Sequence, residues 1–385
     1  MIKPGIDVLL QRGLGDLHGA ALGLLTGAGG VTSDLVPTLT ALRAHPEACL
    51  VALFGAEHGV RGEAAAGEHV PSRRDAATGL PVHSLYGATR EPTDTMLAGL
   101  EAIVVDLQDV GLRYYTYPST VLALLRAAAP RGIAVVVLDR PAPLTGTILE
   151  GPVAEPAFRS FVGAALVPVR HGLTLGELAC WMNARDDIGA DLRVVAMDGW
   201  RRGMWFDDTG LPWVPPSPNI PSLAACVAYT ATCLIEGTTV SEGRGTTQPF
   251  EVIGAPWVDA YTLAAHLNDL NLPGVRFRPT WFRPATSKHA GHSCGGVQLH
   301  VVDRIAFAGV RTGLHLLATL RSLYPEQVAW VRDASGSYVV DLLLGTDAPR
   351  HAIERGDDVD VVVALWQSAI EVFKAKRAAF LLYGE

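Results

Sequence analysis

One short stretch of the chain places an acid, an imidazole and a guanidinium group between glycines. It reads Gly55-Ala56-Glu57-His58-Gly59-Val60-Arg61-Gly62 and follows an apolar run at residues 50–54 that is typical of a buried strand. The glycines let the backbone turn sharply, so Glu57, His58 and Arg61 extend from one loop. A carboxylic acid beside apolar groups can donate a proton near neutral pH, and this loop therefore predicts acid–base chemistry.

Two further polar segments follow apolar runs in the same way. Residues 102–106 continue into Leu107-Gln108-Asp109, and residues 133–138 continue into Asp139-Arg140. Ligands bind outside the carboxyl ends of the strands in an open α/β sheet. We therefore expect all three polar segments to open onto one cleft.

A second carboxylate in this cleft could activate water or stabilise positive charge on a substrate. Asp106, Asp109 and Asp139 are the candidates for that role beside the glutamate of the glycine-framed loop. The structural alternative is that Asp106 and Asp139 cap helices while Arg113 and Arg140 pair with them. For any single one of these residues the two interpretations carry similar weight.

Aromatic and planar polar side chains cluster in the same part of the sequence. A sugar ring has an apolar face and a rim of hydroxyls, so it suits a site that offers both kinds of contact. Ordinary packing in the core remains the alternative for at least one of the tyrosines. The residues that offer such contacts are Tyr114, Tyr115, Tyr117, Gln108, Asn219 and Trp213.

Metal ligands are present but not at the spacings of known sites. Glu57-His58 with Glu68-His69, or His289 and His292 with Cys294, could supply nitrogen, oxygen and sulfur. Neither set forms an HExxH or paired C-x-x-C motif, so we expect no metal. The glycines at residues 13–15 and 27–30 do not complete G-x-G-x-x-G, and no G-x-S-x-G elbow occurs, which disfavours a dinucleotide site and a serine hydrolase.

The composition is that of a globular protein with a large core. Of 385 residues, 49% are hydrophobic and 18% charged, which excludes low-complexity disorder. The net charge of −8 gives no footprint for nucleic acid, and no apolar run approaches the roughly 20 residues that span a bilayer. The first seven residues lack the pattern of a secretory signal, so we expect a cytoplasmic protein, or a periplasmic or secreted one if a leader has been removed.

Apolar runs alternate with segments of helical periodicity over the first two hundred residues. This alternation predicts an α/β fold with a Rossmann-like, doubly wound, mostly parallel sheet. The predicted strands are residues 21–26, 50–54, 102–106, 133–138 and 192–197, and the predicted helices are residues 34–43, 93–99, 119–129 and 174–183.

The pattern changes after Trp200. A proline-rich loop at residues 211–221 excludes regular helix, and the break at Gly254-Ala255-Pro256 precedes a new helix signal. We therefore predict a catalytic domain at residues 1–254 and a smaller α+β domain at residues 255–385. Its predicted strands are residues 297–302 and 338–343, and its predicted helices are residues 259–270, 310–323 and 359–380.

Taken together, the polar segments closely resemble those of the exo-β-N-acetylmuramidases of the NamZ type, a glycoside hydrolase family formerly classed as a domain of unknown function. The resemblance runs in order through nearly the whole chain. The matching segments are residues 54–62, 105–117, 138–141, 168–174, 211–221, 236–250, 287–288 and 296–304.

The resemblance implies a Rossmann-like domain with a smaller partner domain and a cleft that binds no nucleotide and needs no cofactor. It implies release of a terminal β-1,4-linked N-acetylmuramic acid from the non-reducing end of peptidoglycan fragments. The glutamate of the G-x-E-H-G-x-R-G motif, here Glu57, is then the catalytic residue. The sequence departs from the family pattern at Ala56 and Tyr115, neither of which touches this acid.

On this interpretation Glu57 is a general acid, and His58 and Asp109 position it or a water. The lactyl carboxylate of muramic acid would favour a guanidinium, and the candidates are Arg61, Arg113, Arg170 and Arg244. The other predicted substrate contacts are Asp106, Gln108, Tyr114, Tyr115, Tyr117, Asp139, Arg140, His171, Asn219 and Glu236.

Two other classes of protein remain open at this stage. A muropeptide-binding protein without turnover would need the same arginines and tyrosines. A metal-dependent amidase or esterase would lose its activity with a chelator. No sequence feature decides the oligomeric state.

Overall fold

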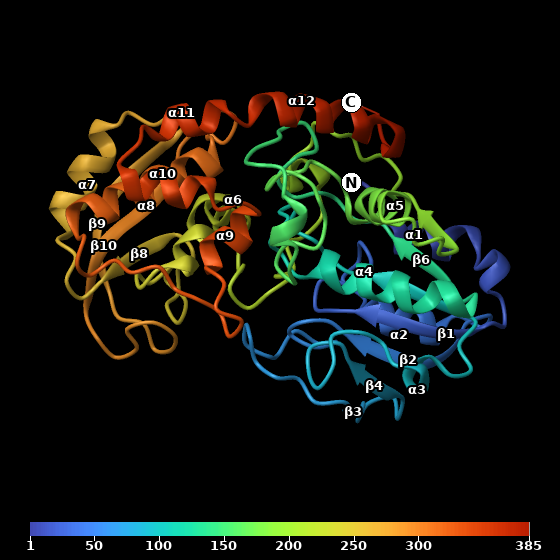
Figure 1. Cartoon of the computed structure of the whole chain (residues 1–385). Coiled ribbons are helices and arrows are strands. Elements are labelled where there is room, and N and C mark those ends of the chain that lie inside the picture. Colours follow the sequence, from blue (N-terminus) through green and yellow to red (C-terminus); the bar gives the residue numbers. More distant parts are fainter. Residues whose placement is uncertain (385) are drawn as a thin grey trace.

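The computed structural model describes residues 1–384, which form two units built on separate sheets (Figure 1). The first unit holds a seven-stranded sheet in the order β3-β4-β2-β1-β5-β6-β7. Every neighbouring pair is parallel except β3 with β4. The strands are β1 (Ala21–Thr26), β2 (Cys49–Gly55), β3 (Arg73–Arg74), β4 (Pro81–Ser84), β5 (Ala102–Asp106), β6 (Ala134–Leu138) and β7 (Leu192–Val195).

Helices cover both faces of this sheet. On β5, Ala102 and Val104 pack into a cluster with residues of α1 and α2, whereas Ile103 and Val105 pack into a cluster with α4 and α5. Such strands, buried on both faces, confirm the predicted doubly wound fold. The helices of this unit are α1 (Gly5–Arg12), α2 (Thr38–Ala44), α3 (Asp94–Leu97), α4 (Tyr117–Ala128) and α5 (Leu175–Arg185).

The crevice where Rossmann-type proteins bind nucleotides lies at the carboxyl ends of β1 and β5, where the strand order reverses. Here protein side chains fill it. Arg140 pairs with Asp106 at 2.5 Å and donates to the carbonyl of Val31, and Thr26 donates to the carbonyl of Asp106. The remaining cavity measures about 20 Å³, against roughly 300–1,000 Å³ for a typical ligand site.

The second unit holds a three-stranded antiparallel sheet in the order β8-β10-β9. Helix α6 packs on α8 and on β10 in this unit, and the domain boundary at residue 254 stays a prediction. The elements are α6 (Leu223–Thr232), β8 (Val252–Ala255), α7 (Ala260–Asp269), β9 (Val275–Phe282), β10 (Cys294–Val301), α8 (Gly309–Leu323), α9 (Val339–Leu344), α10 (Ala348–Arg355), α11 (Val359–Ala364) and α12 (Gln367–Arg377).

Two predictions for the second unit were wrong. Residues 338–343, predicted as a strand from their β-branched and leucine content, form helix α9 because Val340, Leu343 and Leu344 are buried at helical spacing. The predicted helix at residues 359–380 is divided into α11 and α12 with a break at Leu365 and Trp366.

Helix α12 leads the chain back across the first unit (Figure 1). Phe373 stacks edge-on against Trp181 with ring centroids 5.0 Å apart, and Tyr383 donates to Asp139 at 2.6 Å. In the other direction, the guanidinium of Arg113 donates to the carbonyl of Leu343 at 2.9 Å. These contacts fix the relative position of the two units. Over residues 1–384, no helix has both the length and the apolar character needed to cross a membrane.

Candidate active site

A cavity of about 430 Å³ lies between the two units. Its wall joins loops that follow β2, β4 and β5 to residues of α6, α9 and the segments around them. Several lining side chains are polar or aromatic, as a sugar site requires. They include Glu57, His58, Tyr86, Arg90, Tyr114, Tyr115, Thr116, Ser160, Phe161, Ser217, Tyr229, Glu236, Arg244, Phe250 and Asp333.

Both oxygens of the Glu57 carboxylate are held, although the side chain faces the cavity and its residue is only 8% exposed. The Thr116 hydroxyl donates to Oε2 at 2.7 Å, and the Gly67 backbone N–H donates to Oε1 at 2.9 Å. A backbone N–H can only donate, whereas a hydroxyl can donate or accept. A proton on Glu57 therefore belongs on Oε2, where the Thr116 hydroxyl can turn to accept from it.

His58 occupies a left-handed backbone conformation with φ 74°, which turns the loop immediately after Glu57. Its Nδ1 lies 2.9 Å from the carbonyl of Ala64, so Nδ1 carries the hydrogen. Burial lowers the pKa of His58, which favours the neutral ring and leaves Nε2 as an acceptor. At the end of the loop, Gly62 has φ 75° and a Cβ there would lie 2.6 Å from Ala28.

The turn after β4 brings two further side chains to the cavity. The Leu85 N–H donates to the carbonyl of Gly55 at 2.8 Å, which places Tyr86 beside Glu57. Burial, together with the Glu57 carboxylate, raises the pKa of Tyr86 to about 12, so its hydroxyl stays protonated. The guanidinium of Arg90 lies over the rings of Phe161 and Tyr86, with its carbon 4.3 Å and 5.3 Å from their centroids.

The second unit contributes a chain of charges to the opposite wall. Arg244 pairs with Glu236 at 2.6 Å and with Glu242 at 3.4 Å, and Lys288 pairs with Glu242 at 3.0 Å. Arg244 also lies over the ring of Phe250, 4.9 Å from its centroid. Its Nη1 is buried and has no hydrogen-bond partner among the described residues. One buried donor on this wall is therefore available to a ligand.

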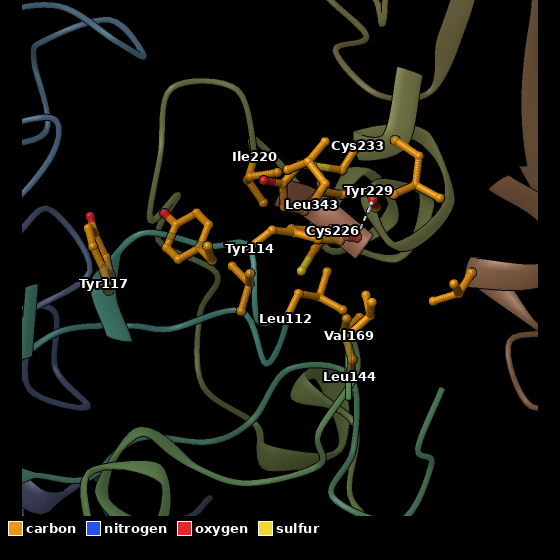
Figure 2. Packing of buried hydrophobic residues seen from close by; sticks show 14 of the residues in the cluster. Leu112, Tyr114, Tyr117, Leu144, Val169, Ile220, Cys226, Tyr229, Cys233 and Leu343 are labelled. Carbon is orange, nitrogen blue, oxygen red and sulfur yellow. Dashed lines mark hydrogen bonds between the residues drawn. The ribbon is translucent and has the colours of Figure 1, made fainter. Parts of the chain in front are cut away.

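Tyr114 and Tyr115 line the cavity. The Tyr114 hydroxyl donates to the carbonyls of Tyr229 and Thr230, and Figure 2 shows its side chain among Cys226, Tyr229 and Leu343. Tyr115 stacks edge-on against Tyr117 with centroids 4.8 Å apart. Tyr114 therefore offers a ligand its ring, because its hydroxyl is already used.

Tyr117 and Asn219 lie beside the cavity and do not line it. Tyr117 donates to the carbonyl of Pro216 at 2.8 Å, which anchors the proline-rich loop. Asn219 lies on that loop between Ser217 and Ile220, which do line the cavity. Tyr117 thus supports the wall through the proline-rich loop, and the substrate contacts of both residues stay predictions.

Asp109 has an unusual environment outside the cavity lining. Its Oδ2 accepts from the Gly111 N–H at 2.8 Å, while its Oδ1 is buried with no partner among residues 1–384. Burial raises the pKa of Asp109 to about 7. This is a carboxyl group that burial keeps protonated up to neutral pH, and it lies outside the cavity lining.

The remaining residues that were predicted to contact the substrate make hydrogen bonds and ion pairs within the chain, outside the cavity lining. Asp106 and Arg140 pair with each other, Gln108 donates to the Pro141 carbonyl, and Asp139 accepts from Thr174, Gly176 and Tyr383. These contacts agree with the structural interpretation of Asp106, Asp139 and Arg140, in which the residues cap helices and form ion pairs.

The other three arginines that were predicted to bind the substrate also interact with groups of the protein itself. Arg61 pairs with Asp75 at 2.7 Å, Arg113 donates to the carbonyls of Pro152, Val167 and Leu343, and Arg170 pairs with Glu150 at 2.9 Å. His171 is fully buried, and burial together with nearby Arg377 and Arg113 lowers its pKa to about 3.

Sequence reasoning did not identify several lining residues, among them Tyr86, Arg90, Thr116, Phe161, Phe250 and Asp333. Thr116 lies within the matching segment at residues 105–117 and could have been found there. Tyr86 and Arg90 follow the four-residue strand β4, which carries no clear apolar run. In the described part of the chain, no three His, Cys, Asp or Glu side chains form a group able to hold a metal ion.

A doubly wound unit, a smaller antiparallel unit and a carboxylate-bearing cavity between them define a two-domain α/β protein of the kind that binds small polar ligands. Comparison with known proteins identifies its family. A model of the exo-β-N-acetylmuramidase NamZ N-terminal domain matches residues 22–224, and one of the NamZ C-terminal domain matches residues 227–383. The chain belongs to this family, which confirms the resemblance found in the sequence.

Individual relatives agree with this assignment. The chain is 46% identical over 382 residues to the peptidoglycan β-N-acetylmuramidase NamZ of Bacillus subtilis (strain 168), covering 99% of this chain and 91% of that protein. Crystal structures of two DUF1343 family proteins from Bacteroides fragilis NCTC 9343 are also similar. One has a TM-score of 0.90 at 36% sequence identity, with 99% of each chain covered. The other has a TM-score of 0.79 at 29% identity, with 100% of this chain and 99% of that chain covered.

Proposed function

We propose that the chain is an exo-acting glycoside hydrolase that releases terminal β-1,4-linked N-acetylmuramic acid from the non-reducing end of peptidoglycan fragments. The family and the relative named as a peptidoglycan β-N-acetylmuramidase support the substrate. The observation that carries the chemistry is the Glu57 carboxylate, which is buried in the cavity wall and held through both oxygens. A cavity of about 430 Å³ has room for a terminal sugar.

In the proposed mechanism Glu57 is the general acid. Its proton, on Oε2, passes to the glycosidic oxygen as the bond to the anomeric carbon breaks, and a water then adds to that carbon and returns a proton to the Glu57 carboxylate. Thr116 and Gly67 orient the carboxyl group, and Tyr86 remains a donor beside it. The carboxylate of Glu236, on the opposite wall, stabilises positive charge that develops on the sugar ring.

The neutral His58 ring accepts through Nε2, which suits it to orient a sugar hydroxyl or a water. Tyr114 and Tyr115 supply aromatic surface, and Arg244 supplies the unpartnered Nη1 donor. We leave Asp109 out of the reacting groups because it does not line the cavity. The substrate contacts predicted for Arg61, Asp106, Gln108, Arg113, Tyr117, Asp139, Arg140, Arg170, His171 and Asn219 are left out for the same reason.

The test is release of free N-acetylmuramic acid from a muramic-acid–glucosamine disaccharide, followed by chromatography, with and without chelator. The proposal expects release that chelator does not reduce. It also expects no release from an oligosaccharide whose non-reducing end is glucosamine. Binding of the disaccharide without release would favour a muropeptide-binding protein, and loss of activity with chelator would favour a metal-dependent amidase or esterase. The cytoplasmic location stays a prediction.

A further inference from the structure

The charged side chains that line the cavity are not equally available to an anionic ligand. They are Glu57, Arg90, Glu236, Arg244 and Asp333, a set with one more acid than base. A terminal muramic acid brings a further negative charge on its lactyl group. Binding it therefore needs a cation whose charge the protein has not already balanced.

Arg244 does not meet this requirement. Glu236 and Glu242 both pair with it, and the only other cation of this cluster, Lys288, pairs with Glu242 as well. The cluster holds two positive and two negative charges, so a third carboxylate would be repelled by those already present. The free Nη1 of Arg244 suits a neutral acceptor instead, such as a sugar hydroxyl or the acetamido carbonyl oxygen.

Arg90 does meet it. Within residues 1–384 no carboxylate lies at ion-pair distance from its guanidinium, and its N–H groups make no hydrogen bond. Its contacts are with ring faces, those of Phe161 at 4.3 Å and Tyr86 at 5.3 Å. Stacking leaves the edge of the guanidinium plane, which carries its donors, free for a carboxylate.

Local hydrogen bonds hold the backbone of the turn that carries Arg90. The Thr89 hydroxyl donates to the Glu91 carbonyl at 2.8 Å and accepts from the Glu91 N–H at 3.0 Å, which closes the turn that carries Arg90. The Val70 N–H donates to the Tyr86 carbonyl at 3.0 Å, which ties this turn to the loop that holds Glu57. Arg90 is exposed at the rim while Glu57 is buried, so a sugar positioned at Glu57 can direct a substituent outward to Arg90.

We infer that Arg90 is the specificity residue that binds the lactyl carboxylate of the terminal muramic acid through a forked pair of N–H donors. The inference rests on the proposed function and adds to it the group that distinguishes muramic acid from glucosamine. Removal of this contact lowers affinity for the charged sugar and leaves affinity for an uncharged analogue unchanged.

The experiment measures binding by calorimetry in the Glu57→Gln background, which removes turnover from the measurement. The ligands are N-acetylmuramic acid and its lactyl methyl ester, which keeps the shape and loses the charge. With Arg90 intact, the acid is expected to bind about 10- to 100-fold more tightly than the ester. With Arg90→Gln, the two ligands should bind equally, and Arg90→Lys should restore part of the preference because it keeps the charge without the fork.

Arg61→Gln is the matched control, because Arg61 is an exposed arginine of the Glu57 loop that does not line the cavity. It should keep the full preference for the acid. The inference is overturned if Arg90→Gln keeps that preference, or if Arg244→Gln abolishes it while Arg90→Gln does not. These outcomes are measured without turnover, so a failure of the proposed hydrolase activity would appear separately, in the assay of the wild-type protein.

Discussion

Replacing Thr116 by valine tests how the structure prepares Glu57. Valine has nearly the shape of threonine and lacks the hydroxyl that donates to Glu57 Oε2 at 2.7 Å. Thr116 is the N-cap residue of α4, but its side chain makes no capping hydrogen bond, so the helix loses little. The change therefore removes one contact of the carboxyl group and leaves the fold in place.

The size of the effect follows from that single hydrogen bond. A hydrogen bond to a charged group contributes about 1.5–3 kcal/mol, and each 1.36 kcal/mol in the barrier is tenfold in rate. The Gly67 N–H still holds Oε1, so Glu57 stays in the cavity wall. We expect kcat to fall about 10- to 100-fold while KM changes by less than about threefold, because the bond orients the acid rather than the sugar.

The assay is initial-rate kinetics of N-acetylmuramic acid release, with thermal unfolding measured in parallel. Thr116→Ser keeps a hydroxyl and should recover most of the rate. Thr120→Val is the matched control, since its hydroxyl lies one turn along α4 and makes only a 3.4 Å contact with the Thr116 carbonyl. A kcat for Thr116→Val within twofold of the control would refute the role given to this hydroxyl.

Three further predictions concern residues outside the cavity lining. Burial raises the pKa of Asp109 to about 7, above the roughly 3.9 of an unfolded chain, so its contribution to stability falls as pH rises between about 4 and 7. Asp109→Asn should therefore raise the unfolding temperature more at pH 8 than at pH 4.5. The corresponding gain in the free energy of unfolding is at most about 4 kcal/mol, and an equal effect at both pH values would contradict the prediction. Tyr383→Phe removes the bond to Asp139 at 2.6 Å and the acceptor of the Met197 N–H at 3.0 Å, and it should lower the free energy of unfolding in urea by about 1–3 kcal/mol with kcat unchanged. Arg61→Gln should leave kcat/KM within about twofold, because Arg61 pairs with Asp75 outside the cavity lining, and a tenfold loss would place it in the site.

The central sheet could be predicted closely because its strands are buried on both faces. β1 and β5 have the predicted bounds, since an uninterrupted apolar run has no other stable placement. The short strands β3 and β4 were not predicted, because β3 is only two arginines and β4 mixes polar and apolar residues. The segment of α9 has strong β propensity and is nevertheless helical, because its apolar side chains pack against the segment that ends at Gly237.

The candidate site was harder to predict than the fold. Glu57 and His58 share a turn, so their common position follows from local sequence. Pairings between distant segments do not, and Arg113 and Arg170 carry the same chemistry in the sequence as Arg244. Only the folded chain shows that Arg113 donates to backbone carbonyls and that Arg170 pairs with Glu150. Arg244 and Arg90, in contrast, line the cavity. Charged residues in matching motifs thus include both side chains that line the cavity and side chains in internal ion pairs.

The measurement that tests the central claim most directly compares Glu57→Gln with Glu63→Gln in the release of N-acetylmuramic acid. Glu63 lies on the same loop with its side chain half exposed, and it pairs with Arg73. General acid catalysis contributes about 10²–10⁴-fold, so Glu57→Gln should lose at least about 100-fold in kcat while still binding the sugar. Glu63→Gln should keep the wild-type rate. A Glu57→Gln protein that is folded and retains more than about a tenth of the wild-type kcat would contradict the assignment of Glu57 as the general acid.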